Sequence, residues 1–302
     1  MTSISFNREH DVEYGACEQL SPLIRRVTAN NPSPFTFKGT GTYIIGHGGV
    51  AVIDPGPDDD AHLQALMAAL EGERVSHILV THTHSDHSEL VPKFKAATGA
   101  AVYAYATHTK NEGTIESGNV ELDASGDHGF EPDVELGHGD MIEGPDWRFE
   151  AVFTPGHMSN HMSFALPQEK ALFAGDHVMA WSTSVVAPPD GSMADYLASL
   201  RLLLTRDDEI YWPTHGGPVR NPQPYVEAFI EHRLAREHAI LERLAAGDET
   251  IADMVPKIYQ GLDLKLYPAA SMSMLAHLVH LIEKGEALAD SDPSLDAHYA
   301  ST

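Results

Sequence analysis

The sequence predicts an α/β fold, and two observations support this class: alternating helix and strand patterns over residues 63–105, and a later group of short strands followed by a helix. In the first region, apolar side chains recur at helical spacing over 63–70, and an apolar strand follows at 75–80. A helix over 89–98 and a strand over 101–105 repeat this order. Strand, helix and strand over about thirty residues form a crossover unit, which joins parallel strands.

The later strands lie near 148–153, 161–166 and 171–175, and their spacing is typical of antiparallel neighbours. A helix over 194–205 follows them and carries leucines on its buried side. Nearer the start of the chain, two apolar runs flank a glycine-rich turn at 46–49 and predict a hairpin.

Two further segments complete this part of the chain. Residues 25–28 have strand character. Residues 107–146 are rich in Gly, Asp, Glu, Asn and His with little periodicity, which predicts a long loop region with short strands. Long loops in compact domains are often functional, so we expect this one to form a wall of the functional site.

The pattern changes after His215, and helical periodicity follows from residue 223. It predicts one long helix over 223–246 and two shorter helices near 250–260 and 270–284. We therefore predict two domains, a catalytic domain over 1–222 and a small helical domain over 223–302.

The motif at residues 81–87, THTHSDH, lies between the strand at 75–80 and the next helix. Three imidazoles and a carboxylate in so short a stretch are costly to bury unless a cation holds them. Neutral imidazole and carboxylate together suit zinc. Side chains two apart share a face of an extended chain, so we expect His82 and His84 to serve one metal. Asp86 and His87 then serve a second.

Two metal sites need more ligands than this motif contains, and three later strands end at a similar polar motif. In each, a histidine or an aspartate is flanked by glycine or proline. These motifs are Thr154-Pro155-Gly156-His157, Ala174-Gly175-Asp176-His177 and Pro213-Thr214-His215-Gly216-Gly217.

The order HxHxDH, PGH, GD and THG resembles the metallo-β-lactamase superfamily, over residues 21–220. The resemblance implies a four-layer αβ/βα sandwich with two metal ions. It also implies these ligands: His82, His84 and His157 for the first metal, Asp86, His87 and His215 for the second, and Asp176 bridging both. Asp54 matches the family's aspartate near the metal-binding loop, and we interpret it as a residue that orients the loop or a ligand imidazole.

The C-terminal helices resemble the winged-helix appendage of the β-lactamase-like and glyoxalase II-like hydrolases, a group that includes an endoribonuclease-like branch. The segments 20–22 and 26–32 resemble the same branch. Ser88-Glu89-Leu90 stands where many members of the superfamily have two small residues, so the chain departs from subfamilies defined by them.

The function predicted from this resemblance is binuclear zinc-dependent hydrolysis, in which a metal-bridging hydroxide attacks a small ester, thioester or lactone. Iron or manganese are alternative metals. Asp86 and Asp176 would orient the hydroxide. Either metal-bound water or His161, four residues after His157, would protonate the leaving group.

Three other functions stay open. The appendage resemblance favours a phosphodiesterase or endoribonuclease-like hydrolase. Some relatives are mononuclear iron oxidoreductases that oxygenate persulfides, and retained second-site ligands do not exclude that chemistry. A non-catalytic regulator that binds a partner or nucleic acid through its C-terminal helices is the third, and the intact ligand set counts against it.

Charge and composition limit the kinds of molecule that the protein is expected to bind. The net charge of −25 comes from 19 basic and 44 acidic residues, which disfavours a large nucleic-acid footprint because phosphates are bound by lysine and arginine. Cys17 is the single cysteine, so no internal disulfide forms. The sequence has no signal segment and no run of membrane-spanning length. We expect a cytoplasmic protein that acts on a small molecule without a membrane, and a homo-oligomer stays open.

Overall fold

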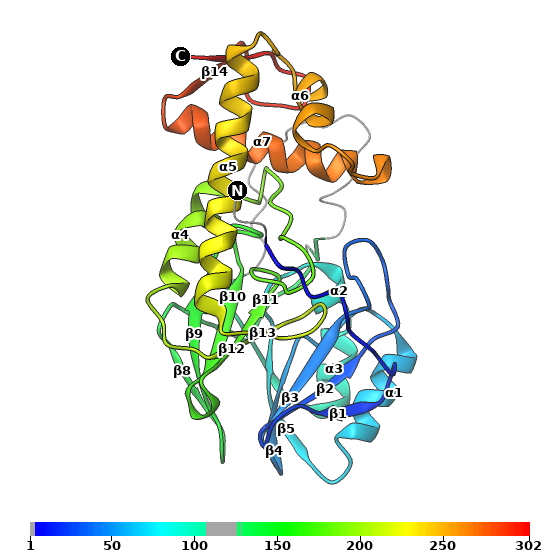
Figure 1. The fold of residues 1–302 in the computed structure, drawn as a ribbon. Helices are drawn as coiled ribbons and strands as arrows, with labels where there is room; N and C mark the ends of the chain where they lie inside the picture. Colours follow the sequence, from blue (N-terminus) through cyan, green and yellow to red (C-terminus); the bar gives the residue numbers. More distant parts are fainter. Residues whose placement is uncertain (1–3, 107–125, 128) are drawn as a thin grey trace.

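Two mixed β-sheets packed face to face form the centre of the molecule (Figure 1). The structure is a computed structural model that describes residues 4–106, 126–127 and 129–302. The seven-stranded sheet has the order β1-β2-β3-β4-β5-β6-β7, and the six-stranded sheet has the order β13-β12-β11-β10-β9-β8. The first sheet contains β1 (Cys17–Gln19), β2 (Ile24–Thr28), β3 (Gly41–Ile45), β4 (Gly49–Ile53), β5 (Arg74–Leu79), β6 (Ala101–Ala104) and β7 (Val134–Glu135). The second contains β8 (Met141–Glu143), β9 (Arg148–Phe153), β10 (Met162–Leu166), β11 (Ala171–Gly175), β12 (Ile210–Pro213) and β13 (Val219–Arg220).

Alternating side chains on the strands build two different cores. On β3, Tyr43 packs between the sheets whereas Ile44 faces the outer helices. On β11, Phe173 packs between the sheets, and Leu172 lies on the opposite face. Because successive side chains of a strand point to opposite faces, both faces of each sheet must be covered. This requirement explains why β3, β4, β10 and β11 are buried along nearly their whole length rather than at alternate residues.

Helices supply that cover. α1 (Asp60–Ala69) and α3 (Val91–Thr98) share an apolar cluster with the outer face of the seven-stranded sheet. α4 (Met193–Leu203) and the first half of α5 (Pro222–Ala245) do the same for the six-stranded sheet. The order helix, sheet, sheet, helix is the predicted four-layer sandwich, and the predicted α/β class is confirmed.

The carboxyl ends of several strands gather at one edge of the sandwich. β4 and β5 are parallel, as are β11 and β12, and β9 runs in the same direction as β11 because both are antiparallel to β10. Loops that follow these strands therefore emerge together. One of them contains the single-turn helix α2 (Ser85–Ser88).

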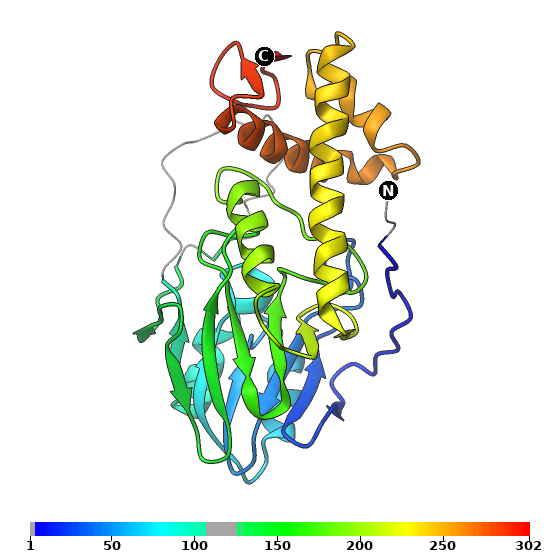
Figure 2. The same ribbon diagram turned by 60° about the vertical axis from the view of Figure 1, so that its left-hand side comes forward.

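The C-terminal appendage has its own apolar core. α6 (Ile251–Ile258), α7 (Tyr267–Glu283) and the hairpin of β14 (Ala287–Ala289) and β15 (Tyr299–Ser301) pack around the second half of α5. α5 thus belongs to both cores: Phe229 packs in the sandwich and Ile240 packs in the appendage. Figure 2 shows this helix running beside α4 and continuing into the appendage.

The long loop region predicted over 107–146 falls partly outside the described residues. Its described part contains the short strands β7 and β8. β1 lies in a stretch for which no strand was predicted. The division into domains at residue 222 stays a prediction, since α5 begins there and serves both cores. Within the described ranges, no helix has the length and apolar character needed to cross a membrane.

Candidate metal centre

The side chains predicted as metal ligands meet at the edge where the parallel strands end. The motif at 81–87 follows β5, His157 follows β9, Asp176 follows β11 and His215 follows β12. These loops are far apart in sequence, and the shared direction of their strands brings them together.

Three histidines form the first ligand group. His84 Nδ1 lies 3.0 Å from His82 Nε2 and 3.1 Å from His157 Nε2. These nitrogens converge on one point, and ligand atoms of all three residues lie within 4.8 Å of one another. Such a spacing fits a single cation held by neutral imidazoles.

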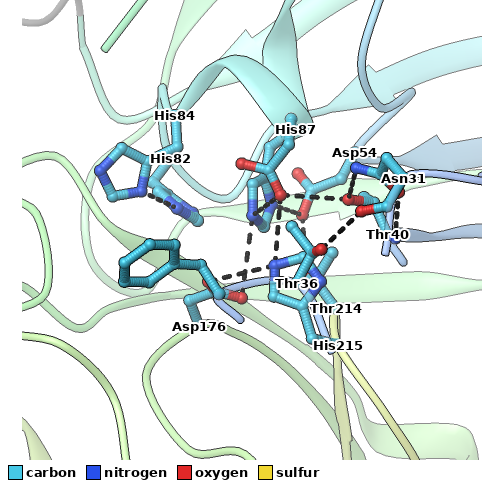
Figure 3. Close-up of polar contacts among 12 residues, drawn as sticks. Asn31, Thr36, Thr40, Asp54, His82, His84, His87, Asp176, Thr214 and His215 are labelled. Atoms are coloured by element: carbon cyan, nitrogen blue, oxygen red, sulfur yellow. Dashed lines mark hydrogen bonds and ion pairs between the residues drawn. The ribbon is translucent and has the colours of Figure 1, made fainter. Parts of the chain in front are cut away.

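Asp86, His87 and His215 form the second group. His215 Nε2 lies 3.2 Å from Asp86 Oδ2, and His87 Nε2 lies 3.5 Å from the same oxygen. Asp176 lies between the groups, since its Oδ2 is 3.3 Å from His215 Nε2 and 3.9 Å from His157 Nε2. Figure 3 shows Asp176 beside His215, with His82 and His84 to one side.

The electrostatics of the cluster suit a divalent cation. Burial, with His157 beside it, lowers the pKa of His84 to about 3, so this imidazole is neutral at pH 7, as a metal ligand must be. Burial opposes protonation of His215 too, but Asp176 and Asp86 raise its pKa to about 10. His87 Nε2 and Asp176 Oδ1 are buried and have no hydrogen-bond partner in the described part of the chain. A metal ion would satisfy these atoms and displace the protons that the carboxylates attract.

Hydrogen bonds hold the far side of three of the predicted ligand imidazoles. His87 Nδ1 is 2.9 Å from Asp54 Oδ2, His157 Nδ1 is 2.6 Å from the Val185 carbonyl, and His215 Nδ1 is 3.2 Å from the Gly39 carbonyl. Each oxygen accepts a hydrogen bond from Nδ1–H. The proton therefore stays on Nδ1, and the lone pair of Nε2 faces the cluster. These bonds therefore fix the tautomer that a metal ligand needs.

Asp54 lies at the end of β4 with a positive φ of 50°, a conformation that aspartate tolerates better than most residues. Its carboxylate also accepts hydrogen bonds from the Thr81 amide and hydroxyl, both at 2.8 Å, and from the Thr214 hydroxyl at 3.1 Å. One buried carboxylate thus joins two ligand loops to His87. These contacts support the orienting role expected of Asp54, which stays a prediction.

His161, the predicted alternative proton donor, uses both ring nitrogens inside the fold. Its Nδ1 lies 2.9 Å from the Thr154 hydroxyl, and its Nε2 accepts the Asp176 amide at 3.2 Å. A Cβ at Gly175 would come within 2.4 Å of that Nε2, so glycine is required for this approach. The contacts place His161 behind Asp176, and its proton-donor role stays a prediction.

Several residues that lie at the site were not predicted from the sequence. The Thr40 hydroxyl donates to Asp86 Oδ2 at 3.1 Å, and Asn31 in turn binds Thr40. Phe37 and Trp181 stack with ring centres 4.8 Å apart, beside Gly216. Thr81 and Thr214 sit within the motifs themselves, and their hydroxyls next to ligand positions could have identified them.

Comparisons with known proteins agree with the architecture. Residues 36–215 match the family described as the metallo-beta-lactamase superfamily, and residues 250–295 match the beta-lactamase associated winged helix domain. The second match confirms the predicted winged-helix character of the appendage.

Among curated proteins, the chain is 32% identical over 260 residues to an atrochrysone carboxyl ACP thioesterase of Aspergillus fumigatus, covering 80% of this chain and 74% of that protein. It is 30% identical over 255 residues to a beta-lactamase-like protein 2 homolog of Caenorhabditis elegans, covering 80% and 78%. Among solved structures, a metallo-beta-lactamase family protein from Thermus thermophilus superposes with a TM-score of 0.78 at 23% identity, covering 94% of this chain and all of that one. The chain belongs to the metallo-beta-lactamase superfamily.

Proposed function

We propose that this chain is a hydrolase that uses two divalent metal ions, with zinc as the expected metal, to cleave a thioester or a related ester or lactone of a small molecule. The observation that carries the proposal is the convergence of seven expected ligand side chains, in which a middle group of His82, His87 and Asp176 shares His82 with the first group and His87 with the second. Two metals are favoured over one because the second group has a complete set of its own, Asp86, His87 and His215.

When bound, the metal ions supply Lewis acidity and a nucleophilic water at neutral pH. The chain supplies orientation. Asp86 is held by Thr40, and Asp176 is held through its amide by His161. Each carboxylate has two oxygens, so we assign both residues the further task of orienting the attacking water.

A thioester is the preferred substrate class because of the leaving group. Water adds to the acyl carbon, the C–S bond breaks, and the products are a carboxylic acid and a thiol. A thiol has a pKa of about 8.5, so it departs as a thiolate with little help from a general acid. The engagement of both His161 nitrogens favours a reaction of this kind, and the Aspergillus fumigatus relative is named a thioesterase.

The neighbouring surface suits an apolar acyl group. Phe37 and Trp181 stack at an interplanar angle of 10°, and Trp181 lies against Gly216, which follows the ligand His215. The positive φ of 56° at Phe37 is unusual for a bulky residue and is typical of functional loops. We assign this pair to the acyl side of the substrate.

The test is metal content per chain, measured by plasma mass spectrometry on protein purified without added metal or chelator, together with a hydrolysis screen. We expect about two zinc ions per chain in the wild type and fewer in His87→Ala. In a panel of thioesters, oxygen esters, lactones and phosphodiesters, thioesters should be hydrolysed fastest. One iron per chain with oxygen consumption on a persulfide would replace this proposal with the oxygenase alternative. Turnover of phosphodiesters alone would replace it with the endoribonuclease-like one.

A further inference from the structure

The loop that follows β11 bears on two of the expected ligands. Asp176 lies at its start, and the carbonyl of Val185, nine residues further on, accepts a hydrogen bond from His157 Nδ1 at 2.6 Å. A displacement of this loop would therefore move Asp176, which lies between the two groups, and the carbonyl that holds His157 of the first group. Whatever holds the loop holds the geometry of the centre.

Two buried hydroxyls hold the loop from within the sandwich. The Ser184 hydroxyl lies 2.5 Å from the Asp176 carbonyl and 2.8 Å from the His177 carbonyl. Tyr196 on α4 donates its hydroxyl to the same His177 carbonyl at 2.8 Å. The backbone of Tyr196 also contacts the other ligand loop, because a Cβ at Gly156 would come within 2.3 Å of its Cα.

Arg233 reaches this loop from α5, 49 residues beyond Ser184 in sequence. Its Nη2 donates to the Ser184 carbonyl at 2.5 Å, and its guanidinium carbon lies 4.9 Å from the centre of the Tyr196 ring. The residue is only 3% exposed. No carboxylate oxygen of the described residues lies within 4.0 Å of it, so its charge is buried without an ion pair. Burying an unpaired charge is costly. The hydrogen bond and the aromatic contact that this guanidinium makes lie on the loop and on Tyr196.

We propose that Arg233 is a positioning residue for the metal centre, through which the helix shared with the appendage keeps the 176–185 loop in place. The proposal rests on the proposed function, since it takes Asp176 and His157 as metal ligands. It gives α5 a part in the site although none of its residues belongs to the ligand groups.

The chain contains a matched control one turn further along the same helix. Arg236 donates Nη1 to the Ile258 carbonyl at 2.8 Å, and its guanidinium carbon lies 4.5 Å from the centre of the Tyr259 ring. It therefore makes the same pair of interactions as Arg233, a carbonyl bond and an aromatic contact. Its partners lie on and just after α6, away from the metal-binding loops.

The experiment compares zinc release from the zinc-loaded wild type, Arg233→Met and Arg236→Met into a chromophoric chelator, well below the unfolding temperature of each protein. Arg233→Met should release zinc about tenfold faster than the wild type, the scale expected when a supporting contact of a metal site is lost. Arg236→Met should release zinc at the wild-type rate, even if its melting temperature falls as much as that of Arg233→Met. Arg233→Lys keeps the positive charge and a donor group but loses the planar guanidinium, so its release rate should lie between those of Arg233→Met and the wild type.

Other results would overturn the inference. Unchanged release from Arg233→Met, or equal acceleration in both methionine variants, would show that the arginine only stabilises the fold. If Arg233→Met does not fold, Tyr196→Phe keeps the ring beneath the guanidinium and removes the hydroxyl bond to the loop; wild-type release from that variant counts against the inference. A wild-type chain that binds no metal overturns the proposed function together with it, whereas a metal-loaded, active wild type with unaffected Arg233→Met overturns this inference alone.

Discussion

Asp54 and His87 form a buried hydrogen-bonded pair, with 2.9 Å between the carboxylate Oδ2 and Nδ1. The pair lies at the junction of the motif after β5 with the loop after β12, because Thr81 and Thr214 donate to the same carboxylate. The consequence for His87 is a fixed tautomer, in which Nε2 is free to face the second ligand group.

Replacement of Asp54 by asparagine should weaken metal binding about tenfold or more, since the Nδ1–H of His87 loses its carboxylate acceptor. Asparagine tolerates the positive φ of this position, so the backbone should not be strained. The measurement is zinc affinity by chelator competition at fixed pH. Asp59→Asn, at the half-buried N-cap of α1, is the control and should bind zinc as the wild type does. Equal affinity in both variants would remove Asp54 from the metal centre.

Gly175 offers a test of the support behind Asp176. Its φ is +52°, and an added Cβ would come within 2.4 Å of His161 Nε2, which accepts the Asp176 amide. Gly175→Ala should lower the free energy of unfolding by about 1–2 kcal/mol or more, the cost of a left-handed L-residue, and should also lower zinc content. Urea unfolding and mass spectrometry measure the two effects.

Gly99→Ala provides the comparison for that variant. Gly99 has a φ of +70°, and nothing lies within 4 Å of the place that a Cβ would take, so alanine there brings backbone strain without a clash. We expect a smaller loss of stability and full zinc content. A matching loss of zinc in both variants would mean that general destabilisation, rather than the contact with His161, empties the site.

The appendage should contribute a pH-dependent part of stability through Glu237. Burial raises the pKa of this carboxyl, but the neighbouring imidazoles outweigh burial and lower it to about 2. His280 Nδ1 lies 2.7 Å from Glu237 Oε1, and His277 Nδ1 lies 3.6 Å from the same oxygen. Because the folded pKa lies below the unfolded value of about 4.3, the carboxylate stabilises the fold above that value. This contribution, roughly 2–3 kcal/mol, is lost as the pH falls from about 5 to about 2.

Denaturant unfolding of the wild type and Glu237→Gln across that pH range measures this contribution. The stability difference between the two proteins should be largest near pH 6 and should shrink toward pH 2. A difference that stays constant with pH would mean that Glu237 acts through packing alone. Zinc-free protein should be used for both, so that metal loss at low pH does not enter the comparison.

Metal removal should lower the stability of the whole sandwich. A ligand that binds only the folded chain stabilises it by about 2.7 kcal/mol when its free concentration is one hundred times the dissociation constant. Chelated protein should therefore melt earlier than zinc-loaded protein, and added zinc should restore the midpoint. His84→Ala, which removes a ligand of the first group, should show a smaller zinc-dependent shift. If the melting temperature of the wild type does not change with zinc, the assignment of these residues to a metal centre is contradicted.

The parts of the site that depend on short stretches of sequence could be predicted. Each expected ligand follows an apolar strand within a few residues, and the strand directions that bring His157 and His215 together are those of the predicted α/β class. The appendage helices were also visible, because α5 and α7 have long apolar periodicity and end near glycines. Their residue bounds agree with the expected ranges within a few positions.

The supporting contacts could not be predicted in the same way. Thr40 lies 46 residues from Asp86, and Arg233 lies 49 residues from Ser184, so neither pair leaves a local pattern. Arg233 also falls in a charged run that is typical of a solvated helix face, yet the residue is buried. The strands of the β14–β15 hairpin are too short for an alternating apolar pattern to identify them.

The sharing of α5 between two cores has a consequence for how the molecule opens. A helix of 24 residues is about 36 Å long, and its two halves are buried against different partners. Fraying of the half that carries Ile240 and Leu244 would weaken the half that covers the six-stranded sheet, since helix formation is cooperative. Amide hydrogen exchange along α5 should therefore be slow and nearly uniform, without a step at the boundary between the two cores.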